Sequence, residues 1–289
     1  MHTGACSARQ LARNAAEKLE SAGVPEPVAS AEILLAELLG VKRGELALLG
    51  EPVTDDKADL YKAWISRRLK REPVQRILGY AYFRNLKLEL NEHTLIPRPD
   101  TESVVDAALG VVDSWGGACR VLDLGTGSGA IAISVAQERS SCEVHATDDS
   151  DGALRVARRN AARAGAKVRF YKTDLAPSLE ALEGSIEVLV SNPPYVKSGD
   201  IPKLAPEVRD WDPHVALDGG PDGFHFYRRI FAEATPLLVC GAGVVLEVGD
   251  RQAQEVLELG RCAGFVPLGA HPDLAGTLRA VLLCWGGAG

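Results

Sequence analysis

From Arg120 onward, short apolar segments alternate with segments of helical period, and this alternation constrains the fold more than any other feature of the chain. The expected strands cover residues 121–124, 143–147, 168–171, 186–190, 244–248, 265–268 and 278–284. The expected helices cover residues 130–138, 152–164 and 252–263. Because neighbouring parallel strands need a crossover connection, which is usually a helix, this order predicts a doubly wound α/β sheet.

The first 78 residues have a different period, since their apolar residues recur at helical spacing. We expect helices from Ser7 to Gly23, from Glu26 to Leu39, and from Thr54 to Pro73. The inward face of the last helix is predicted to carry Leu60, Trp64, Ile65 and Leu69. Residues 1–78 therefore read as a small helical domain. It contains no catalytic constellation, so we assign it to substrate docking.

A β-hairpin is predicted within a linker at residues 79–99. Apolar residues alternate with polar ones there, at Tyr80, Tyr82, Leu86, Leu88 and Leu90. The prolines of Leu95-Ile96-Pro97-Arg98-Pro99 then enforce an extended approach to a helix that ends near Trp115. The α/β domain is expected to occupy residues 100–289.

A glycine-rich loop closes the first strand of that domain and opens the next helix. It reads Asp123-Leu124-Gly125-Thr126-Gly127-Ser128-Gly129. Glycines at such a junction let the backbone approach a ligand closely. The spacing is Gly-x-Gly-x-Gly, whereas a dinucleotide fingerprint is Gly-x-Gly-x-x-Gly. The stretch resembles the first motif of S-adenosylmethionine-dependent methyltransferases, a resemblance that implies cofactor contacts from Asp123, Gly125, Thr126, Gly127, Ser128 and Gly129.

Two acids at later strand ends fit the same cofactor. Asp148 ends the second strand, where a carboxylate can accept both hydroxyls of a ribose. Asp174, with Leu175 beside it, follows the third strand at the place where this kind of fold meets an adenine. The alternative is that both acids cap helices or end strands without a ligand, as many carboxylates in α/β proteins do.

The fourth strand is followed by Asn192-Pro193-Pro194-Tyr195, which we take as the candidate catalytic motif, and Asn192 is expected to contact the cofactor as well. Two prolines cannot continue a sheet ladder because neither has a backbone N–H. The loop is therefore stiff and offers carbonyl oxygens, one amide side chain and one aromatic face. Such a loop suits a planar amide or amine; alone, it is also compatible with a rigid turn.

Taken together, these motifs resemble the HemK/PrmC family of peptide chain release factor glutamine N5-methyltransferases. The match includes Pro73-Val74-Gln75-Arg76-Ile77-Leu78-Gly79, the linker with Asp100-Thr101-Glu102, and Asp273-Leu274-Ala275-Gly276 with Arg279. The family has a glutamate-proline pair in the loop after the motif, and this chain has Asp212-Pro213. Arg98 is left out of the site because a structural salt bridge explains it equally well.

The resemblance implies a Rossmann-like class I methyltransferase sheet and methyl transfer from S-adenosylmethionine to the glutamine amide of the Gly-Gly-Gln loop in release factors. Asn192 and the carbonyl of Pro193 would accept the two amide hydrogens, Tyr195 would pack on the amide plane, and Pro194 would stiffen the loop. A glutamine methyltransferase of a ribosomal protein and an adenine-N6 DNA methyltransferase use the same motif and stay as alternatives. A cofactor-binding regulator without turnover is a further one.

Charge and cysteine content bear on these alternatives. The formal charge of −7 and the pI of about 5.5 argue against a protein that mainly coats a nucleic-acid backbone. The six cysteines are scattered, with no Cys-x-x-Cys pair, so neither a metal site nor a disulfide framework is expected. No apolar signal core follows Met1. We therefore expect a cytoplasmic protein that binds neither membranes nor nucleic acid stably.

Overall fold

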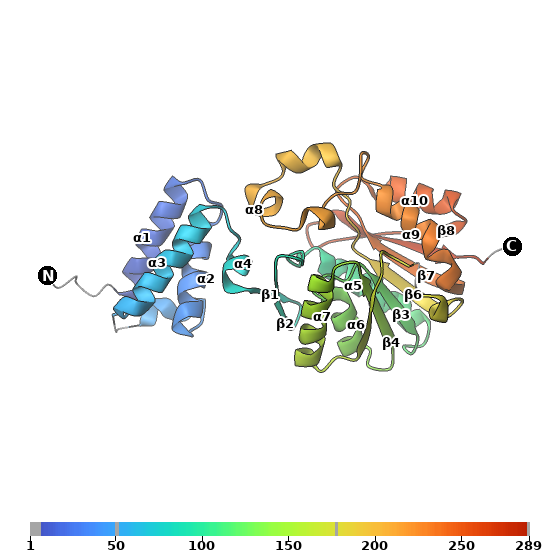
Figure 1. Cartoon of the computed structure of the whole chain (residues 1–289), viewed down its shortest axis with the longest axis horizontal. Coiled ribbons are helices and arrows are strands. Elements are labelled where there is room, and N and C mark those ends of the chain that lie inside the picture. Colours follow the sequence, from blue (N-terminus) through green and yellow to red (C-terminus); the bar gives the residue numbers. More distant parts are fainter. Residues whose placement is uncertain (1–6, 50–51, 177–178, 288–289) are drawn as a thin grey trace. The chain divides into compact units, whose positions relative to one another are not determined.

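The computed structural model describes residues 7–49, 52–176 and 179–287. These residues form two compact units (Figure 1). The smaller unit consists of Met1–Gly79 together with Pro206–Trp211, and the larger consists of Tyr80–Ala205 together with Asp212–Gly289. No sequence pattern indicated that the short segment 206–211 groups with the helical unit. Within the described residues, no helix has the length and apolar character needed to cross a membrane.

The smaller unit is helical, as the sequence predicts. Its helices are α1 (Ala8–Ser21), α2 (Pro27–Leu39), the 3₁₀ helix η1 (Arg43–Leu48), α3 (Asp55–Leu69), α4 (Val74–Leu78) and α8 (Pro206–Arg209). The Ser7 hydroxyl caps α1 by accepting a hydrogen bond from the Gln10 backbone N–H, 3.3 Å away. Leu19, Leu34 and Leu35 are fully buried in the centre of this unit.

The predicted inward face of α3 is partly wrong. Leu60 is 45% exposed and Leu69 is 37% exposed, whereas Tyr61 and Ile65 are buried. The Tyr61 hydroxyl donates a hydrogen bond to the Ala31 carbonyl. The buried stripe follows the spacing i, i+4, i+7, and it ends at Arg68, whose guanidinium reaches the Glu207 carboxylate at 3.0 Å. Tyr61, whose hydroxyl has a hydrogen-bond partner, is thus buried where the spacing of apolar residues predicts Leu60.

The larger unit begins with the predicted hairpin. Strand β1 (Tyr80–Phe83) pairs antiparallel with β2 (Leu86–Glu89). Leu86 and Leu88 are buried as expected, but β1 buries Ala81 and Phe83, and Tyr82 is 70% exposed. The expected apolar face of the first strand is therefore wrong by one residue, because a one-residue shift places every side chain on the opposite face.

The sheet of the larger unit has seven strands in the order β5-β4-β3-β6-β7-β9-β8. The strands are β3 (Arg120–Leu124), β4 (Glu143–Asp148), β5 (Val168–Lys172), β6 (Ile186–Ser191), β7 (Leu238–Glu247), β8 (Phe265–Pro272) and β9 (Leu278–Trp285). Strands β3 to β7 run parallel, while β9 is antiparallel to both β7 and β8. The prediction of parallel strands thus fails at the C-terminal edge, where β8 and β9 are joined without a crossover helix.

Helices cover both faces of this sheet, which confirms the doubly wound class. They are α5 (Thr101–Ser114), α6 (Ala130–Glu138), α7 (Asp151–Ala164), α9 (His225–Glu233) and α10 (Ala253–Cys262). Alternate strand residues separate into two cores: Val121 and Val188 pack with α5 and α6, whereas Leu122 and Leu189 pack with α9 and α10. The chain order reverses at β3, so the carboxyl ends of β3 and β6 form the crevice where such sheets bind ligands.

Candidate functional site

A cavity of about 270 Å³ lies in the larger unit, at the carboxyl ends of the parallel strands. Its walls include the loops that follow β3, β4, β5 and β6. The predicted site residues that line it are Gly125, Thr126, Gly127, Ser128, Asp148, Asp174, Leu175, Asn192, Pro193 and Pro194. Asp123, Gly129 and Tyr195 do not line it. The structure therefore brings ten predicted residues together around one cavity.

The glycine loop presents bare backbone to this cavity. Gly125 and Gly127 have φ of 71° and 56°, a left-handed conformation that L side chains rarely adopt. A Cβ added at either glycine would meet nothing within 4 Å, so their open side is available to a ligand. Gly129 is different, because a Cβ there would lie 2.7 Å from Ile133 Cδ1. It serves the packing of α6 on the loop.

Asp123 holds the glycine loop through hydrogen bonds and has no solvent exposure. Its Oδ2 accepts hydrogen bonds from the Thr126 hydroxyl at 2.6 Å and from the Ala132 backbone N–H at 3.2 Å. Burial raises its pKa to about 7, although both hydrogen bonds oppose the rise. Its Oδ1 has no hydrogen-bond partner among the described residues.

Asp148 joins the loop to the second strand. Its Oδ2 accepts a hydrogen bond from the Gly127 backbone N–H at 2.8 Å, and its Oδ1 accepts one from Ser150 N–H at 2.9 Å. Each carboxylate oxygen has a second lone pair that can accept from a ligand hydroxyl. Burial raises the Asp148 pKa, while the two backbone bonds lower it.

Asp174 and Leu175 follow the third strand. The Asp174 carboxylate is 57% exposed, and Arg229 of α9 holds it at 3.0 Å. Leu175 is buried and has φ of 63°. A branched residue in the left-handed region is strained, and such strain is found most often at functional sites. Both residues line the cavity, Asp174 with a polar side chain and Leu175 with an apolar one.

The motif loop begins where β6 ends. The Ser191 hydroxyl donates to the Leu124 carbonyl at 2.7 Å, so the last residue of β6 is tied to the last residue of β3. Asn192 Nδ2 donates to Thr101 Oγ1 at 3.3 Å. No described residue donates a hydrogen bond to Asn192 Oδ1 or to the Pro193 carbonyl. Two residues that line the cavity, Asn192 and Pro193, thus each have an acceptor oxygen without a donor among the described residues.

Tyr195 is placed differently from the rest of the motif. Its ring packs on the core that contains α9 and α10, and burial raises its pKa to about 12. Glycines make room for it, since a Cβ on Gly219 would lie 2.7 Å from Tyr195 Cα and one on Gly249 would lie 3.0 Å from Tyr195 Cδ2. The first contact explains Gly219, whereas Gly220 has φ of 86° and a Cβ there would lie 2.9 Å from His225 Cβ. The role of Tyr195 over a substrate amide stays a prediction.

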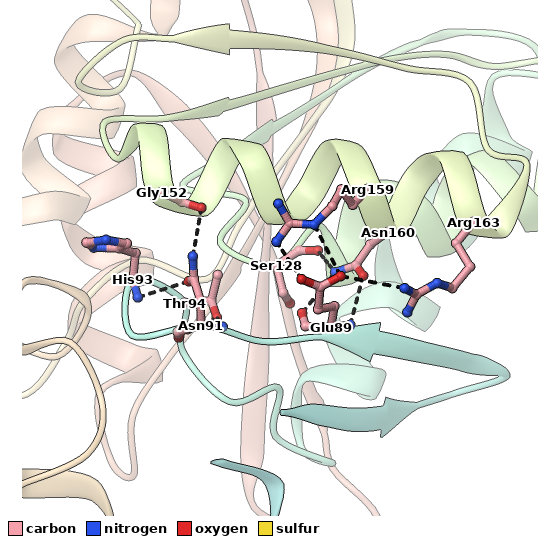
Figure 2. A network of polar contacts seen from close by, with 9 residues as sticks. All are labelled: Glu89, Asn91, His93, Thr94, Ser128, Gly152, Arg159, Asn160 and Arg163. Carbon is pink, nitrogen blue, oxygen red and sulfur yellow. Dashed lines mark hydrogen bonds and ion pairs between the residues drawn. The ribbon is translucent and has the colours of Figure 1, made fainter. Parts of the chain in front are cut away.

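The segment after the hairpin forms a further wall, which the sequence did not indicate. Asn160 of α7 accepts from the Glu89 backbone N–H at 2.8 Å and donates to the Ser128 carbonyl at 2.9 Å (Figure 2). Asn91 donates to the Gly152 carbonyl at 3.1 Å in the same network. The hairpin, α7 and the glycine loop are therefore held together, and His93, Leu95, Pro97 and Arg98 line the cavity.

Arg98 forms the salt bridge that the sequence suggested, and it also borders the cavity. It lines the cavity, and its Nη2 lies 2.5 Å from Asp212 Oδ2. Asp212 therefore keeps a carboxylate in the loop at the position where the HemK/PrmC pattern has glutamate. Phe226 of α9 also lines the cavity and had no sequence signal.

The charges and surfaces of the cavity fit S-adenosylmethionine. The acids Asp148, Asp149 and Asp174 line it, while the lining cation, Arg98, is paired with Asp212. Such a balance suits a ligand that carries ammonium and sulfonium charges. Leu175, Ile131 and Phe226 supply the apolar surface that a purine requires. The open glycine backbone and the two carboxylate oxygens of Asp148 would hold the polar parts.

Two family models match the chain. The PrmC N-terminal domain matches residues 10–79, and the methyltransferase small domain matches residues 112–207. The first match covers most of the helical unit, and the second includes the glycine loop, Asp148, Asp174 and the motif.

Relatives and solved structures agree with these matches. The release factor glutamine methyltransferase of Agrobacterium fabrum is 40% identical over 92% of this chain and 93% of its own length. That of Rhodospirillum rubrum is 42% identical over 94% of this chain and 83% of its own length. A methyltransferase from Pyrococcus furiosus has the same fold, with a TM-score of 0.51 and 20% identity over 78% of this chain and 98% of its own.

Proposed function

Since the chain belongs to the family of release factor glutamine methyltransferases, we propose that it transfers a methyl group from S-adenosylmethionine to N5 of the glutamine in the Gly-Gly-Gln motif of peptide chain release factors. One observation carries the proposal. Asn192 and Pro193 line the cavity that the glycine loop also lines, and neither Asn192 Oδ1 nor the Pro193 carbonyl has a hydrogen-bond donor among the described residues.

Two acceptors are what an amide nitrogen requires. The lone pair of an amide nitrogen is delocalised into its carbonyl, so the nitrogen is a poor nucleophile and catalysis depends on positioning and polarisation. Asn192 would accept one N–H of the substrate amide and Pro193 the other. These two bonds would orient the nitrogen and stabilise the positive charge that develops on it. The surplus proton leaves to water after transfer, so no general base is needed.

The cofactor supplies an electrophilic methyl group on a sulfonium. Asp148 would accept hydrogen bonds from the ribose hydroxyls, and Asp174 with Leu175 would meet the adenine. The loop from Gly125 to Ser128 would approach the cofactor with its backbone, while Asp123 and Gly129 would keep that loop in shape. Pro194 would contribute stiffness. The assignments of the residues that line the cavity follow from their position and from donor or acceptor type, whereas those of Asp123 and Gly129 follow from their contacts with the loop and α6.

The helical unit would dock the protein substrate. Residues 10–79 match the family model of the PrmC N-terminal domain, and their described part contains no group of three or more His, Cys, Asp or Glu side chains that could hold a metal ion. Because translation takes place in the cytoplasm, the proposal places the protein there. Neither a membrane nor a stable nucleic-acid complex is part of this function.

The test is a methylation assay with purified full-length protein, labelled S-adenosylmethionine and bacterial release factor, followed by mass spectrometry of the Gly-Gly-Gln peptide. We expect one added methyl group on the glutamine, and none on a release factor in which that glutamine is replaced by alanine. Ribosomal protein and DNA are tested in parallel. If label entered ribosomal protein or DNA and none entered release factor, the proposal would be overturned.

A further inference from the structure

Glu247 is a buried carboxylate that the proposed chemistry does not use. It is the last residue of β7, an otherwise apolar strand, and only 1% of its surface is exposed. An ionisable group is costly to bury unless partners compensate for its lost hydration. Its polar side-chain neighbours include Thr101 and Asn192, and its Oε2 has no hydrogen-bond partner among the described residues.

These residues come from three separate elements. Thr101 is the first residue of α5 and is 4% exposed, Asn192 follows β6, and β6 pairs with β7 through Ser191 and Leu246, next to Glu247. The sheet therefore places Glu247 beside the start of the motif, because the residues before Asn192 and before Glu247 are paired. Glu247 is not among the residues that line the cavity, whereas Thr101 and Asn192 are.

The donor and acceptor types of this cluster define one direction of hydrogen bonding. A carboxyl group accepts through its carbonyl oxygen even when it is protonated, so the Thr101 hydroxyl can direct its proton to Glu247. The hydroxyl oxygen then accepts from Asn192 Nδ2, which lies 3.3 Å away. With Nδ2 held by Thr101, the other end of the amide, Oδ1, is left to accept from a ligand.

We propose that Thr101 and Glu247 are positioning residues that fix the orientation of the Asn192 amide so that its oxygen faces the substrate. Without them, the amide can turn and offer an N–H to a substrate that also offers N–H groups. The inference rests on the proposed function, because it assigns Asn192 Oδ1 as acceptor for the glutamine amide.

Arg279 and Asp100 form an ion pair next to the cluster of Thr101, Asn192 and Glu247. Arg279 Nη2 lies 3.0 Å from Asp100 Oδ2 and 3.3 Å from Asp273 Oδ2, and its Nη1 donates to the Val248 carbonyl. It thus connects the residue before Thr101 with the residue after Glu247. The Asp273-to-Gly276 stretch with Arg279, which had no assigned role, would hold α5 against the end of β7.

The test uses the full-length protein and compares Thr101→Val, Thr101→Ser and Glu247→Gln. Thr101→Val removes the hydroxyl at nearly constant volume, and Thr101→Ser keeps it. Thr235→Val is the matched control, since Thr235 donates to the Phe231 carbonyl away from the cavity. We measure kcat and KM for release factor, the Kd of S-adenosylmethionine by calorimetry, and the unfolding temperature.

We expect kcat to fall about tenfold in Thr101→Val and in Glu247→Gln, the change that loss of one orienting hydrogen bond gives. The cofactor Kd should change by less than about twofold, because neither group is assigned to the cofactor. Thr101→Ser and Thr235→Val should retain wild-type kcat. Wild-type kcat in Thr101→Val, or an equal loss in Thr101→Ser, would overturn the inference.

A second measurement does not depend on turnover. In the nuclear magnetic resonance spectrum of the wild-type protein, the Asn192 side-chain amide protons should show Overhauser contacts to the Thr101 methyl group. Their absence would overturn the orientation even if the protein methylated its substrate. Failure of the wild-type protein to methylate release factor, with these contacts present, would instead count against the proposed function.

Discussion

Arg98 Nη2 lies 2.5 Å from Asp212 Oδ2, and the Asp212 side chain has no solvent exposure while that of Arg98 is 36% exposed. Asp212 Oδ1 also accepts from the Ile96 backbone N–H at 3.4 Å. One carboxylate thus holds both the linker before α5 and the loop after the motif. Since Arg98 also lines the cavity, this ion pair fixes part of the wall next to the cofactor region.

We expect Arg98→Ala to lower the free energy of unfolding by about 1–3 kcal/mol, because it removes one ion-pair partner from a buried carboxylate. The estimate is below that for a fully buried pair because water screens the exposed part of Arg98. Denaturant unfolding measures it. Arg13→Ala is the control: its pair with Glu17 is exposed on both sides, and it should change stability by less than about 0.5 kcal/mol. Equal effects of the two changes would refute a structural role for the Arg98 pair.

Asn192→Ala should abolish methyl transfer while the Kd of S-adenosylmethionine changes little. The reason is that the change removes an acceptor proposed to act on the substrate amide. Turnover assays with release factor and calorimetry with the cofactor measure the two effects separately. Normal turnover in this variant would remove the motif from the mechanism.

The sequence predicts the residues whose signal is local and misses those whose signal is spatial. Gly127 and Asp148 could be found because glycine spacing and strand ends are visible in a few consecutive residues. Thr101, Asn192 and Glu247 could not be connected, since only the pairing of β6 with β7 and the packing of α5 bring them together. The one sign of this cluster in the sequence was a glutamate, Glu247, within an apolar run.

Backbone pairing also explains the errors in the fold. The apolar runs at the C-terminus gave the positions of β8 and β9, but apolar runs carry no information on strand direction. On α3, the aromatic ring of Tyr61 is buried because its hydroxyl finds the Ala31 carbonyl, a partner on another helix. Such partners appear only when the elements are assembled.

Asp148→Ala should weaken S-adenosylmethionine binding by about 1–3 kcal/mol, through the loss of an acceptor for the ribose and of the bond that holds Gly127 N–H. Calorimetric titration of the purified variant measures this change. Asp151→Ala is a suitable control, because Asp151 is a nearby acid that pairs with Lys172 and does not line the cavity. If Asp148→Ala bound the cofactor with wild-type affinity, the ribose role would be untenable.

Gly152→Ala should destabilise the protein through a clash with the His93 ring. A Cβ on Gly152 would lie 2.0 Å from His93 Cδ2, so the ring, which lines the cavity, must move (Figure 2). A second change, His93→Ala, removes the ring that clashes. The alanine at position 152 is then free to stabilise α7, because alanine is a better helix former than glycine. We therefore expect the double variant to be more stable than Gly152→Ala by about 1 kcal/mol or more. Additive effects in thermal unfolding of the two single variants and the double variant would show that the contact does not exist.

Glu247 should make the stability of the protein depend on pH. Burial raises its pKa from 4.5 to about 7, against the opposing effects of Thr101, Arg279 and Asn192 and with a further rise from Asp100. Tyr195 and Tyr227 are the other titratable groups that face it. Because the folded protein binds this proton more tightly than the unfolded chain, its contribution to stability is complete below about pH 4 and is lost as the pH rises through about 7.

In Glu247→Gln this contribution is absent, so comparison of the two proteins isolates it from other carboxyl groups. The free energy of unfolding of the wild-type protein, minus that of Glu247→Gln, should fall by about 3 kcal/mol between about pH 4 and about pH 8, as the displacement of the pKa requires. Asp123 has a raised pKa as well, but it is present in both proteins and cancels. Denaturant titrations at a series of pH values measure the difference. A difference that does not change with pH would mean that Glu247 ionises in the folded protein as it does in the unfolded chain.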